Sequence, residues 1–268
     1  MAARQLAFIG GGNMAGAIFG GLLRGGWPAD AITVVEPWAE QRERIAAACP
    51  GVRLLAAANV SLAAAEIVVW AVKPQAFAEA AAPCAASVGS ALQLSVMAGI
   101  RSQAIVAATG SERVVRTMPN TPALIGQGIA ALFARPAATR EDRAAVEQVL
   151  APTGQLLWVA REDDLDAVTA LSGSGPAYVF YFIEAMVEAG MQMGLSAEQA
   201  RLLAQQTFAG AAALAQQSSE PVELLRQRVT SKGGTTHAAI TSLDASGVKD
   251  AFVRALHAAR DRARELGQ

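Results

Sequence analysis

The stretch FIGGGNMAGAI, residues 8–18, decides the fold. It follows a short apolar run and contains the spacing Gly10-x-Gly12-x-x-Ala15, which is typical of the first turn of a dinucleotide-binding βαβ unit. Gly10 permits a tight turn, Gly12 lets a pyrophosphate approach the backbone, and Ala15 lets the helix pack closely on the sheet. The N–H groups at the start of that helix favour a phosphate there. Taken alone, the same spacing is also compatible with a purely structural glycine turn.

Working outward from this turn, apolar runs of strand length alternate with helical patterns through the first 160 or so residues. The helical patterns next to the turn cover residues 14–26 and 39–48. The strand candidates are QLAFIG (5–10), ITVVEP (32–37), residues 52–55, EIVVWAVKP (66–74), ALQLSV (91–96), RVVRTMP (113–119), GIAALFA (128–134) and QLLWVA (155–160). Strands that alternate with helices predict a parallel, doubly wound sheet of the Rossmann type.

After Arg161 the strand patterns stop, and the sequence predicts helices only. Ser196 with Gln199 is a capping-box pattern for one of them. The predicted helices run from Pro176 to about Met193, from Ser196 to Gln217, from after Pro221, from near Gly234, and from Val248 to Leu266. We therefore expect an α/β chain with a dinucleotide-binding domain over residues 1–161 and an all-α domain over residues 162–268.

The helix that begins at Pro176 is apolar nearly all round, with six consecutive apolar or aromatic residues from Tyr178 to Ile183. Such a helix must be covered on most sides. A helical domain of this size is too small to cover it alone, so we expect a homodimer with a large apolar interface.

The composition excludes several classes of protein. The 268 residues are 53% hydrophobic and 17% charged, with a formal net charge of −1, so the sequence offers no basic field for nucleic acid or an anionic membrane surface. No apolar run is long enough to span a bilayer. The two cysteines, Cys49 and Cys84, are expected to be buried and unpaired, which fits a cytoplasmic protein, and neither they nor His237 and His257 predict a metal site.

Glu36 ends the second predicted strand, where an acidic residue binds the adenosine ribose hydroxyls and repels a 2′-phosphate. This favours NADH. The alternative is that Glu36 turns outward before Pro37, while Arg42 and Arg44 supply positive charge for NADPH.

Four stretches together make the chain resemble the Δ1-pyrroline-5-carboxylate reductase family over essentially its whole length. They are EIVVWAVKPQ (66–75), RTMPNTPALIGQG (116–128), DAVTALSGSGPAYVFYFIEAMVEAGMQMGLS (166–196) and VTSKGGTTHAAI (229–240). The resemblance implies reduction of a cyclic imine, 1-pyrroline-5-carboxylate, to L-proline with NADPH or NADH as cofactor. It also implies an N-terminal Rossmann domain, a helical domain that interleaves with its twin, and in some members a pentamer of dimers.

Carried over residue by residue, the resemblance assigns candidate cofactor contacts beyond the glycine turn. Asn13 and Met14 join Gly12 at the pyrophosphate, and Asn59 corresponds to a contact on the adenosine side. Ala71, Val72 and Lys73 correspond to a stretch that runs along the cofactor, and Val96 and Ala98 to one nearer the nicotinamide. At the Glu36 position, family members often carry a small polar residue suited to NADPH, so Glu36 departs from the family pattern.

The resemblance places the substrate carboxylate against the loop SKGGTT. A small anion there would meet backbone amides, hydroxyls and the start of a helix, and the glycines leave room for it. The residues concerned are Ser231, Gly233, Gly234, Thr235 and Thr236. Lys232 stands where many family members have proline. The alternative interpretation is a threonine-capped helix start with no ligand.

Thr236 is the predicted catalytic residue, because its hydroxyl can donate to the ring nitrogen as that nitrogen gains basicity during reduction. Glu162 is a second candidate, facing the substrate amine, although the run EDD is also typical of a solvated surface. Ser172 and Ser174 resemble helix caps more than catalysts, and His237 remains a minor candidate acid.

Two other functions compete with imine reduction. The first is a two-domain dehydrogenase of 3-hydroxy acids, which would need a catalytic lysine on a helix of the second domain; no lysine occurs between Asp164 and Thr230. The second is a dinucleotide sensor or dimeric scaffold without turnover.

Overall fold

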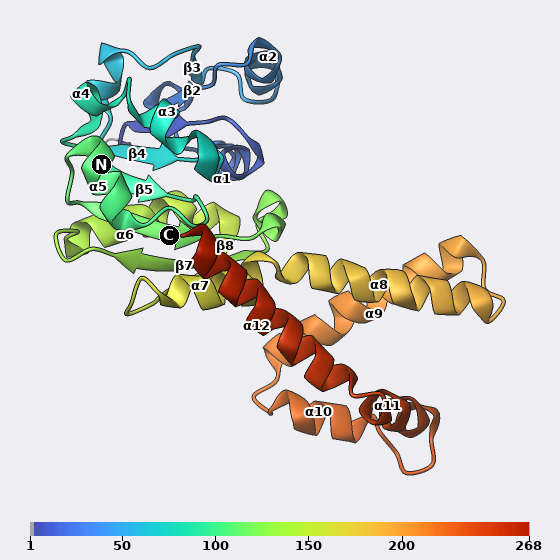
Figure 1. The fold of residues 1–268 in the computed structure, drawn as a ribbon. Helices are drawn as coiled ribbons and strands as arrows, with labels where there is room; N and C mark the ends of the chain where they lie inside the picture. The colour runs from blue at the N-terminus through green and yellow to red at the C-terminus, as the bar shows by residue number, and fades with distance from the viewer. Residues whose placement is uncertain (1–2, 268) are drawn as a thin grey trace. The chain divides into compact units, whose positions relative to one another are not determined.

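The structure, a computed structural model, describes residues 3–267 and contains one eight-stranded sheet in the order β3-β2-β1-β4-β5-β6-β7-β8 (Figure 1). Every strand predicted from the sequence is present, within two residues at most ends. The strands are β1 (Leu6–Ile9), β2 (Ile32–Val35), β3 (Arg53–Leu55), β4 (Ile67–Trp70), β5 (Leu92–Ser95), β6 (Val114–Met118), β7 (Gly128–Ala134) and β8 (Gly154–Trp158).

The sheet is parallel except at one junction, where β7 runs antiparallel to β6. The prediction of a parallel sheet is therefore corrected at this point. The connection between these two strands contains only a short 3₁₀ helix, Thr121–Ile125. Parallel neighbours need a longer crossover, usually a helix, so this short connection forces the chain to turn back. A helix, α6 (Arg140–Leu150), separates β7 from β8, and these two strands are again parallel to each other.

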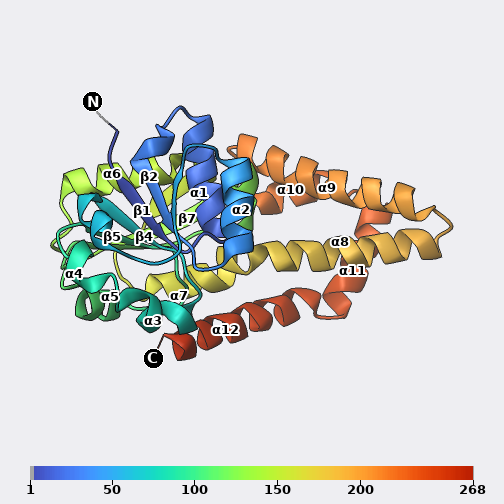
Figure 2. The same ribbon diagram turned by 90° about the horizontal axis from the view of Figure 1, so that it is seen from above.

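Helices cover both faces of the sheet (Figure 2). On one face, α1 (Asn13–Arg24), α2 (Ala39–Ala48) and α6 pack over residues such as Leu6 and Phe8, and the Phe8 and Phe19 rings meet edge to face at 5.5 Å. On the other face, α3 (Phe77–Ala81), α4 (Ala85–Val88) and α5 (Ser102–Thr109) pack over Ala7 and Ile9. Because strand side chains alternate between faces, the short β1 supplies both cores.

One helical stretch, Asp164–Gly173, was not predicted from the sequence. A five-residue helix, α7 (Asp164–Val168), continues into a π-helical turn, Thr169–Gly173, in which Ser174 N–H donates to the Thr169 carbonyl at 2.8 Å. Single π-helical turns frequently occur at functional sites.

Cys84 is buried as predicted, but Cys49, at the end of α2, is only partly buried; both are free thiols.

The remaining helices were all predicted, and each end that the sequence predicted lies within about one residue of the observed end. The capping box is confirmed: Gln199 N–H donates to Ser196 Oγ at 3.2 Å, and Ser196 N–H donates to Gln199 Oε1 at 3.0 Å. These helices are α8 (Gly175–Gln192), α9 (Ala197–Gln217), α10 (Val222–Arg228), α11 (Thr235–Ala245) and α12 (Val248–Leu266).

The chain divides into two compact units, Met1–Ser174 with Ala259–Gln268, and Gly175–Ala258. This division lies later than the predicted boundary between residues 161 and 162. The reason is that α7 and the π-helical turn belong with the sheet: Leu165 is buried there, and Gly173 abuts the Met118 side chain of β6. The C-terminal residues also return to this unit, where the Leu266 carbonyl lies against Gly99.

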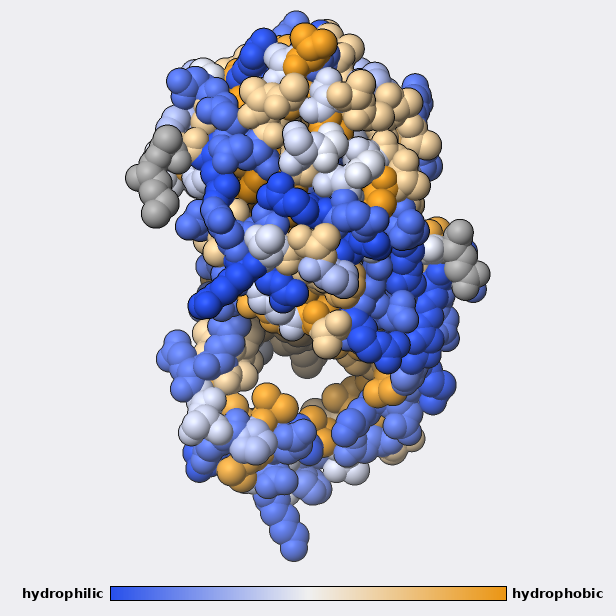
Figure 3. Space-filling model, turned by 90° about the vertical axis from the view of Figure 1, so that its left-hand side faces the viewer, coloured by the Kyte–Doolittle hydropathy of each residue, from blue (hydrophilic) through white to orange (hydrophobic). Residues whose placement is uncertain are grey.

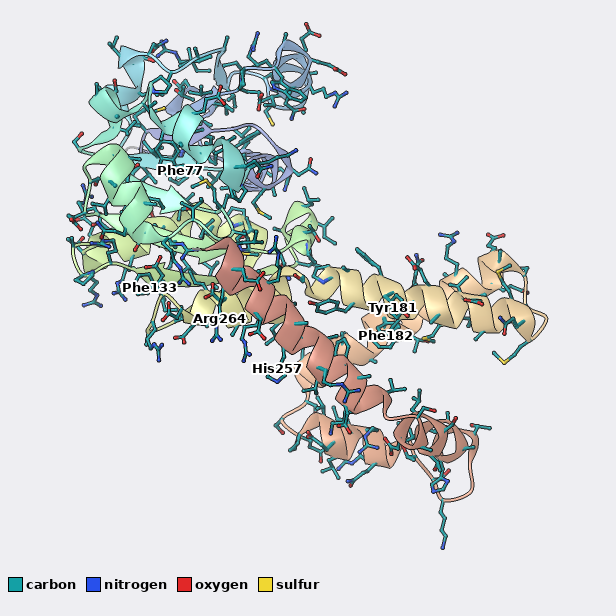
Figure 4. All side chains as sticks on the ribbon, in the orientation of Figure 1. Phe77, Phe133, Tyr181, Phe182, His257 and Arg264 are labelled. Carbon is teal, nitrogen blue, oxygen red and sulfur yellow. The ribbon has the colours of Figure 1, made fainter. Side chains whose placement is uncertain are left out.

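In the helical unit, aromatic side chains join α8 to the first part of α12. The Phe252 ring meets the rings of Tyr178 and Phe182 edge to face, at 5.7 and 5.6 Å between centroids. Other apolar side chains of α8 stay exposed in the single chain, among them Tyr181 at 69%, which Figure 4 labels beside Phe182. On the face drawn in Figure 3, hydrophobic and hydrophilic residues are interspersed. Among the described residues, no helix combines the length and apolarity that crossing a membrane requires.

Candidate active site

The carboxyl ends of four neighbouring strands form one edge of the sheet, and backbone hydrogen bonds join the residues that follow them. Gly10 N–H donates to the Val35 carbonyl and Ala71 N–H to the Ile9 carbonyl, both at 2.9 Å, while Val96 N–H donates to the Trp70 carbonyl at 3.1 Å. The strand order reverses between β1 and β4, and dinucleotides bind at such a switch point. The predicted glycine turn therefore lies where the fold binds a dinucleotide.

Each glycine of the turn is needed for a different reason. Gly10 has φ of 97°, and a Cβ there would lie 2.7 Å from the Ala71 carbonyl oxygen. At Gly11 a Cβ would lie 2.5 Å from Ile45 Cδ1. At Gly12 a Cβ would meet nothing within 4 Å, so this glycine faces open space. Gly10 thus keeps the turn close to the backbone after β4, Gly11 leaves room for the Ile45 side chain of α2, and Gly12 leaves a cradle that a ligand can fill.

The start of α1 is suited to an anion. Its N-cap, Gly12, is extended (φ −73°, ψ −172°), and neither a side-chain cap nor an acidic residue occupies the first turn. Asn13 is exposed there, Met14 is partly buried, and Ala15 is fully buried against the sheet. The first N–H groups of the helix therefore have no partner from a side chain, which is the arrangement that binds phosphates in this fold.

Glu36 faces the glycine turn and does not turn outward. Its Oε2 accepts the Gly11 N–H and its Oε1 accepts the Trp38 N–H, both at 3.0 Å. Arg42 donates to the carbonyls of Glu36 and Pro37 at 2.8 and 2.7 Å, so it braces this corner from the backbone side. The carboxylate therefore stands beside the turn with its negative charge fixed.

Arg44, the second arginine considered for a 2′-phosphate, pairs with Glu40 at 2.5 Å on the surface of α2. The other predicted cofactor contacts follow the carboxyl ends of β3, β4 and β5 in the sequence. Asn59 is exposed, and its Oδ1 accepts the Ser61 N–H at 2.9 Å, which caps the 3₁₀ helix Val60–Ala64.

The stretches that follow β4 and β5 are partly open. Ala71 and Val72 are partly buried and Lys73 is exposed. Val96 and Ala98 are likewise partly buried, on either side of the buried Met97, whose N–H donates to Ser95 Oγ at 3.2 Å. These residues are therefore partly accessible at the edge of the sheet where this fold binds a dinucleotide.

The helical unit carries the second predicted site, the loop before α11. Gly234 N–H donates to the Ser231 carbonyl at 3.0 Å and closes a turn in which Gly233 has φ of 76°. A Cβ on Gly233 would meet nothing within 4 Å, while one on Gly234 would lie 2.7 Å from Ser231 Oγ.

Gly234 is an extended N-cap (φ −80°, ψ 175°), and no side chain caps α11. Thr235 is exposed and Thr236 is partly buried in its first turn. The interpretation of this loop as a threonine-capped helix start is therefore not supported. Its geometry instead leaves the first N–H groups of α11 open to a small anion.

Glu162 does not have the surroundings predicted for a substrate ligand. It lies in the unit that contains the sheet, and both of its carboxylate oxygens are engaged there. Oε1 accepts Ser102 N–H at 2.6 Å and Arg116 Nη1 at 2.8 Å, and Oε2 accepts the Ser102 hydroxyl at 2.7 Å. The interpretation of EDD as a solvated surface fails for Glu162 as well, because this residue is half-buried.

Sequence reasoning assigned no role to the two partners of Glu162. Arg116 belongs to RTMPNTPA, whose match to the family was noted, but nothing in the sequence connects it to a residue 46 positions away. Ser172 of ALSGSGP also behaves differently from a cap: its Oγ donates back to the Val168 carbonyl at 3.1 Å, within the π-helical turn.

Comparison with known proteins agrees with both halves of this description. The family described as "Pyrroline-5-carboxylate reductase dimerisation" matches residues 162–266, and the one described as "NADP oxidoreductase coenzyme F420-dependent" matches residues 5–99. The chain is 44% identical to pyrroline-5-carboxylate reductase of Pseudomonas aeruginosa, over 100% of this chain and 98% of that protein. It is 40% identical to that of Haemophilus influenzae, over 98% and 97%.

Solved structures give the same result. The pyrroline-5-carboxylate reductase of Coxiella burnetii is 36% identical, with a TM-score of 0.91 over 99% of each chain. The pyrroline carboxylate reductase of Plasmodium falciparum, solved with NADP bound, is 28% identical, with a TM-score of 0.88 over the full length of both chains. From its sheet edge, its helical half and these relatives, the chain belongs to the pyrroline-5-carboxylate reductase family.

Proposed function

We propose that this chain reduces the cyclic imine 1-pyrroline-5-carboxylate to L-proline, using a hydride from NADPH or NADH. The observation that carries the proposal is the pair of open anion cradles, one before α1 and one before α11, in a chain of this family. The first would hold the dinucleotide pyrophosphate with Gly10, Gly12, Asn13 and Met14. The second would hold the substrate carboxylate with the amides and hydroxyls of Ser231, Gly233, Gly234, Thr235 and Thr236.

The residues present fit a dinucleotide, because a Cβ at Gly12 would occupy open space where backbone must approach the phosphates. The reduced nicotinamide, when bound, supplies the hydride that adds to the imine carbon. The electron pair of the C=N bond then moves to nitrogen, which keeps the proton it carries as an iminium ion. Thr236 would donate a hydrogen bond to that nitrogen as its basicity rises.

In this reaction the protein mainly has to align the substrate with the cofactor, because no proton has to be abstracted. Among the described residues, neither cradle is built from a cysteine or a pair of carboxylates, and His237 follows Thr236 in the first turn of α11. No group of three or more metal-ligating side chains occurs in the part of the chain that the structure describes.

The position of Glu36 bears on the choice of cofactor. A carboxylate fixed 3.0 Å from the Gly11 amide can accept from a ribose hydroxyl and would repel a 2′-phosphate. We therefore expect this chain to use NADH more readily, relative to NADPH, than relatives that have a small polar residue here.

The exposed apolar face of α8 supports a homodimer. Phe180 is 59% exposed in the single chain, and the neighbouring Val179 and Tyr181 are exposed as well. A hollow of about 520 Å³ lies between α8 and α9, lined by apolar atoms of Ile183, Val187 and Met191 among others. Surfaces of this kind mark protein interfaces, and light scattering during size-exclusion chromatography should give the mass of a dimer or a multiple of it. A monomer at micromolar concentration would contradict this part of the proposal.

The deciding experiment is an assay for oxidation of NADH or NADPH by the purified protein. Oxidation should occur when pyrroline-5-carboxylate is added and should cease when it is omitted. Turnover of 3-hydroxy acids in its place would identify the dehydrogenase alternative. Tight dinucleotide binding without turnover of either substrate class would identify a sensor or scaffold.

A further inference from the structure

The segment Val96–Ile100 connects β5 with α5 in the unit that contains the sheet. It leaves the carboxyl end of β5 and leads into α5 at Ser102. The glycine turn and β2 form the adenosine half of a doubly wound sheet, so β4 and β5 form the half that receives the nicotinamide. The bond from Val96 N–H to the Trp70 carbonyl ties the start of the segment to the end of β4. The segment therefore lies on the nicotinamide side of the edge.

The far end of this segment is held by a residue distant in sequence. The N-cap of α5 is Arg101, whose side chain does not cap the helix. The cap comes instead from Glu162, 60 residues further along, which accepts both the backbone N–H and the hydroxyl of Ser102. A carboxylate at this position satisfies an orphan N–H group and interacts favourably with the positive end of the helix dipole.

Arg116 holds this carboxylate in place from the sheet. It lies on β6, is 4% exposed, and donates to Glu162 Oε1 at 2.8 Å. Burial raises the pKa of Glu162, but the hydrogen bonds from Ser102 and Arg116 outweigh it and hold that pKa below its usual range. The carboxylate is therefore ionised at neutral pH, as a buried guanidinium requires of its partner.

A second set of contacts fixes the same end of the segment. Arg101 donates to Asp163 at 3.0 Å and to the buried Asp166 at 2.9 Å. Gly99, with φ of 77°, lies so close to the C-terminal turn that a Cβ would be 2.9 Å from the Leu266 carbonyl oxygen. The turn between β5 and α5 is thus clamped at its α5 end by residues 162–166 and by the end of α12.

We propose that Glu162 is a positioning residue for the nicotinamide. Through Ser102 it holds the segment Val96–Ile100 in the position that binding of the nicotinamide ring requires. Both of its carboxylate oxygens already accept hydrogen bonds, from Ser102 and Arg116. The inference rests on the proposed function for its catalytic meaning, whereas its structural content concerns dinucleotide binding alone.

The test compares Glu162→Gln with Glu141→Gln. Glu141 is a matched control, because it is an exposed carboxylate of the same unit, paired with Arg4. Two ligands are titrated into each protein: NADH, and ADP-ribose, which lacks the nicotinamide. With a charged hydrogen-bond acceptor removed, Glu162→Gln should bind NADH at least about fivefold more weakly. It should bind ADP-ribose within about twofold of wild type, because the adenosine half is untouched.

Two further measurements separate positioning from loss of fold. Amide hydrogen exchange over residues 96–105 should be faster in Glu162→Gln and unchanged in Glu141→Gln. Ser102→Ala removes the hydrogen bonds of the hydroxyl with Glu162 and Arg135 but leaves Arg116 paired with Glu162, so it should fold normally and show the same selective loss to a smaller degree.

An equal loss of NADH and ADP-ribose binding in both Glu162→Gln and Ser102→Ala would overturn the inference, as would unchanged exchange over residues 96–105. Failure of wild type to reduce pyrroline-5-carboxylate would refute the proposed function only. The ratio of the two binding constants would still decide whether Glu162 positions this segment.

Discussion

Replacing Gly10 by alanine should lower the stability of the fold, whereas replacing Gly12 by alanine should weaken ligand binding, although the two glycines lie two residues apart in one turn. At Gly10 the new Cβ meets the Ala71 carbonyl oxygen at 2.7 Å and Val72 Cγ1 at 3.1 Å, and φ of 97° is unfavourable for any residue with a Cβ. At Gly12 the new Cβ meets nothing within 4 Å, and φ of −73° is ordinary. The first change affects folding, and the second affects the ligand.

The magnitudes follow from these contacts. A positive φ costs Gly10→Ala roughly 1–2 kcal/mol, and the clash with rigid backbone adds about 1–3 kcal/mol. In a unit of this size that sum corresponds to a fall in Tm of roughly 4–20 °C. Gly12→Ala loses only the preference for glycine at an N-cap, which is below about 1 kcal/mol.

The affinity for the dinucleotide should be affected most clearly by the change at Gly12. Gly12→Ala should remain folded yet bind NADH and NADPH at least about tenfold more weakly, or ~1.4 kcal/mol, because its Cβ fills the space that the pyrophosphate needs. Differential scanning calorimetry and fluorescence titration of the reduced nicotinamide measure the two effects separately. If folded Gly12→Ala binds either dinucleotide as tightly as wild type, the cradle before α1 does not hold the pyrophosphate and the site must be sought elsewhere.

Three more changes test separate parts of the structure. Thr236→Ala should lower kcat at least about tenfold in the pyrroline-5-carboxylate assay; unchanged kinetics would remove Thr236 from the reaction. Glu36→Ser should raise kcat/KM for NADPH relative to NADH by about tenfold or more, since a fixed negative charge is removed; an unchanged ratio would mean that Glu36 does not face the ribose. Burial raises the pKa of Asp142, but hydrogen bonds from Arg113 and Thr139 lower it to a value below the usual one. A lowered folded-state pKa stabilises the protein above pH ~4 and loses that effect as pH falls. Asp142→Asn should therefore cost about 1 kcal/mol near neutral pH, and urea unfolding should show the gap from wild type closing in acid; a gap independent of pH would contradict this assignment.

The elements of this fold could be predicted because their signals are local. The glycine turn, the apolar strands and the Ser196 capping box each lie within a few residues of sequence. The reversal of β7 could not be predicted from its apolar run, because a buried strand has the same composition in either direction. The length of the connection from β6 was the available signal, since fewer than a dozen residues cannot make a crossover.

The predicted site residues divide in the same way. Gly10, Gly12 and Gly234 could be assigned roles because glycine at a turn before a helix has a physical meaning that needs no partner. The positioning role proposed for Glu162 could not be predicted, because it depends on Arg116 and Ser102, which are 46 and 60 residues away. A charge cluster such as EDD gives no indication of which member turns inward. The fold alone selects one, by placing it beside an uncapped helix and a buried guanidinium.

The starts of α1 and α11 lack the side-chain capping found at α5, α6 and α9. The structural helices α6 and α9 have full capping boxes, Thr139 with Asp142 and Ser196 with Gln199. α5 is capped from a distance by Glu162. By contrast, α1 and α11 begin with an extended glycine, no side-chain cap and no acid in the first turn. A pyrophosphate and a carboxylate would supply the missing acceptors, so each ligand completes a helix that the sequence leaves open. Binding of each ligand would therefore also stabilise the first turn of its helix. Amide protection in the first turn of α1 should rise with ADP-ribose, and that in α11 with proline; protection without either ligand would mean that the caps are already present.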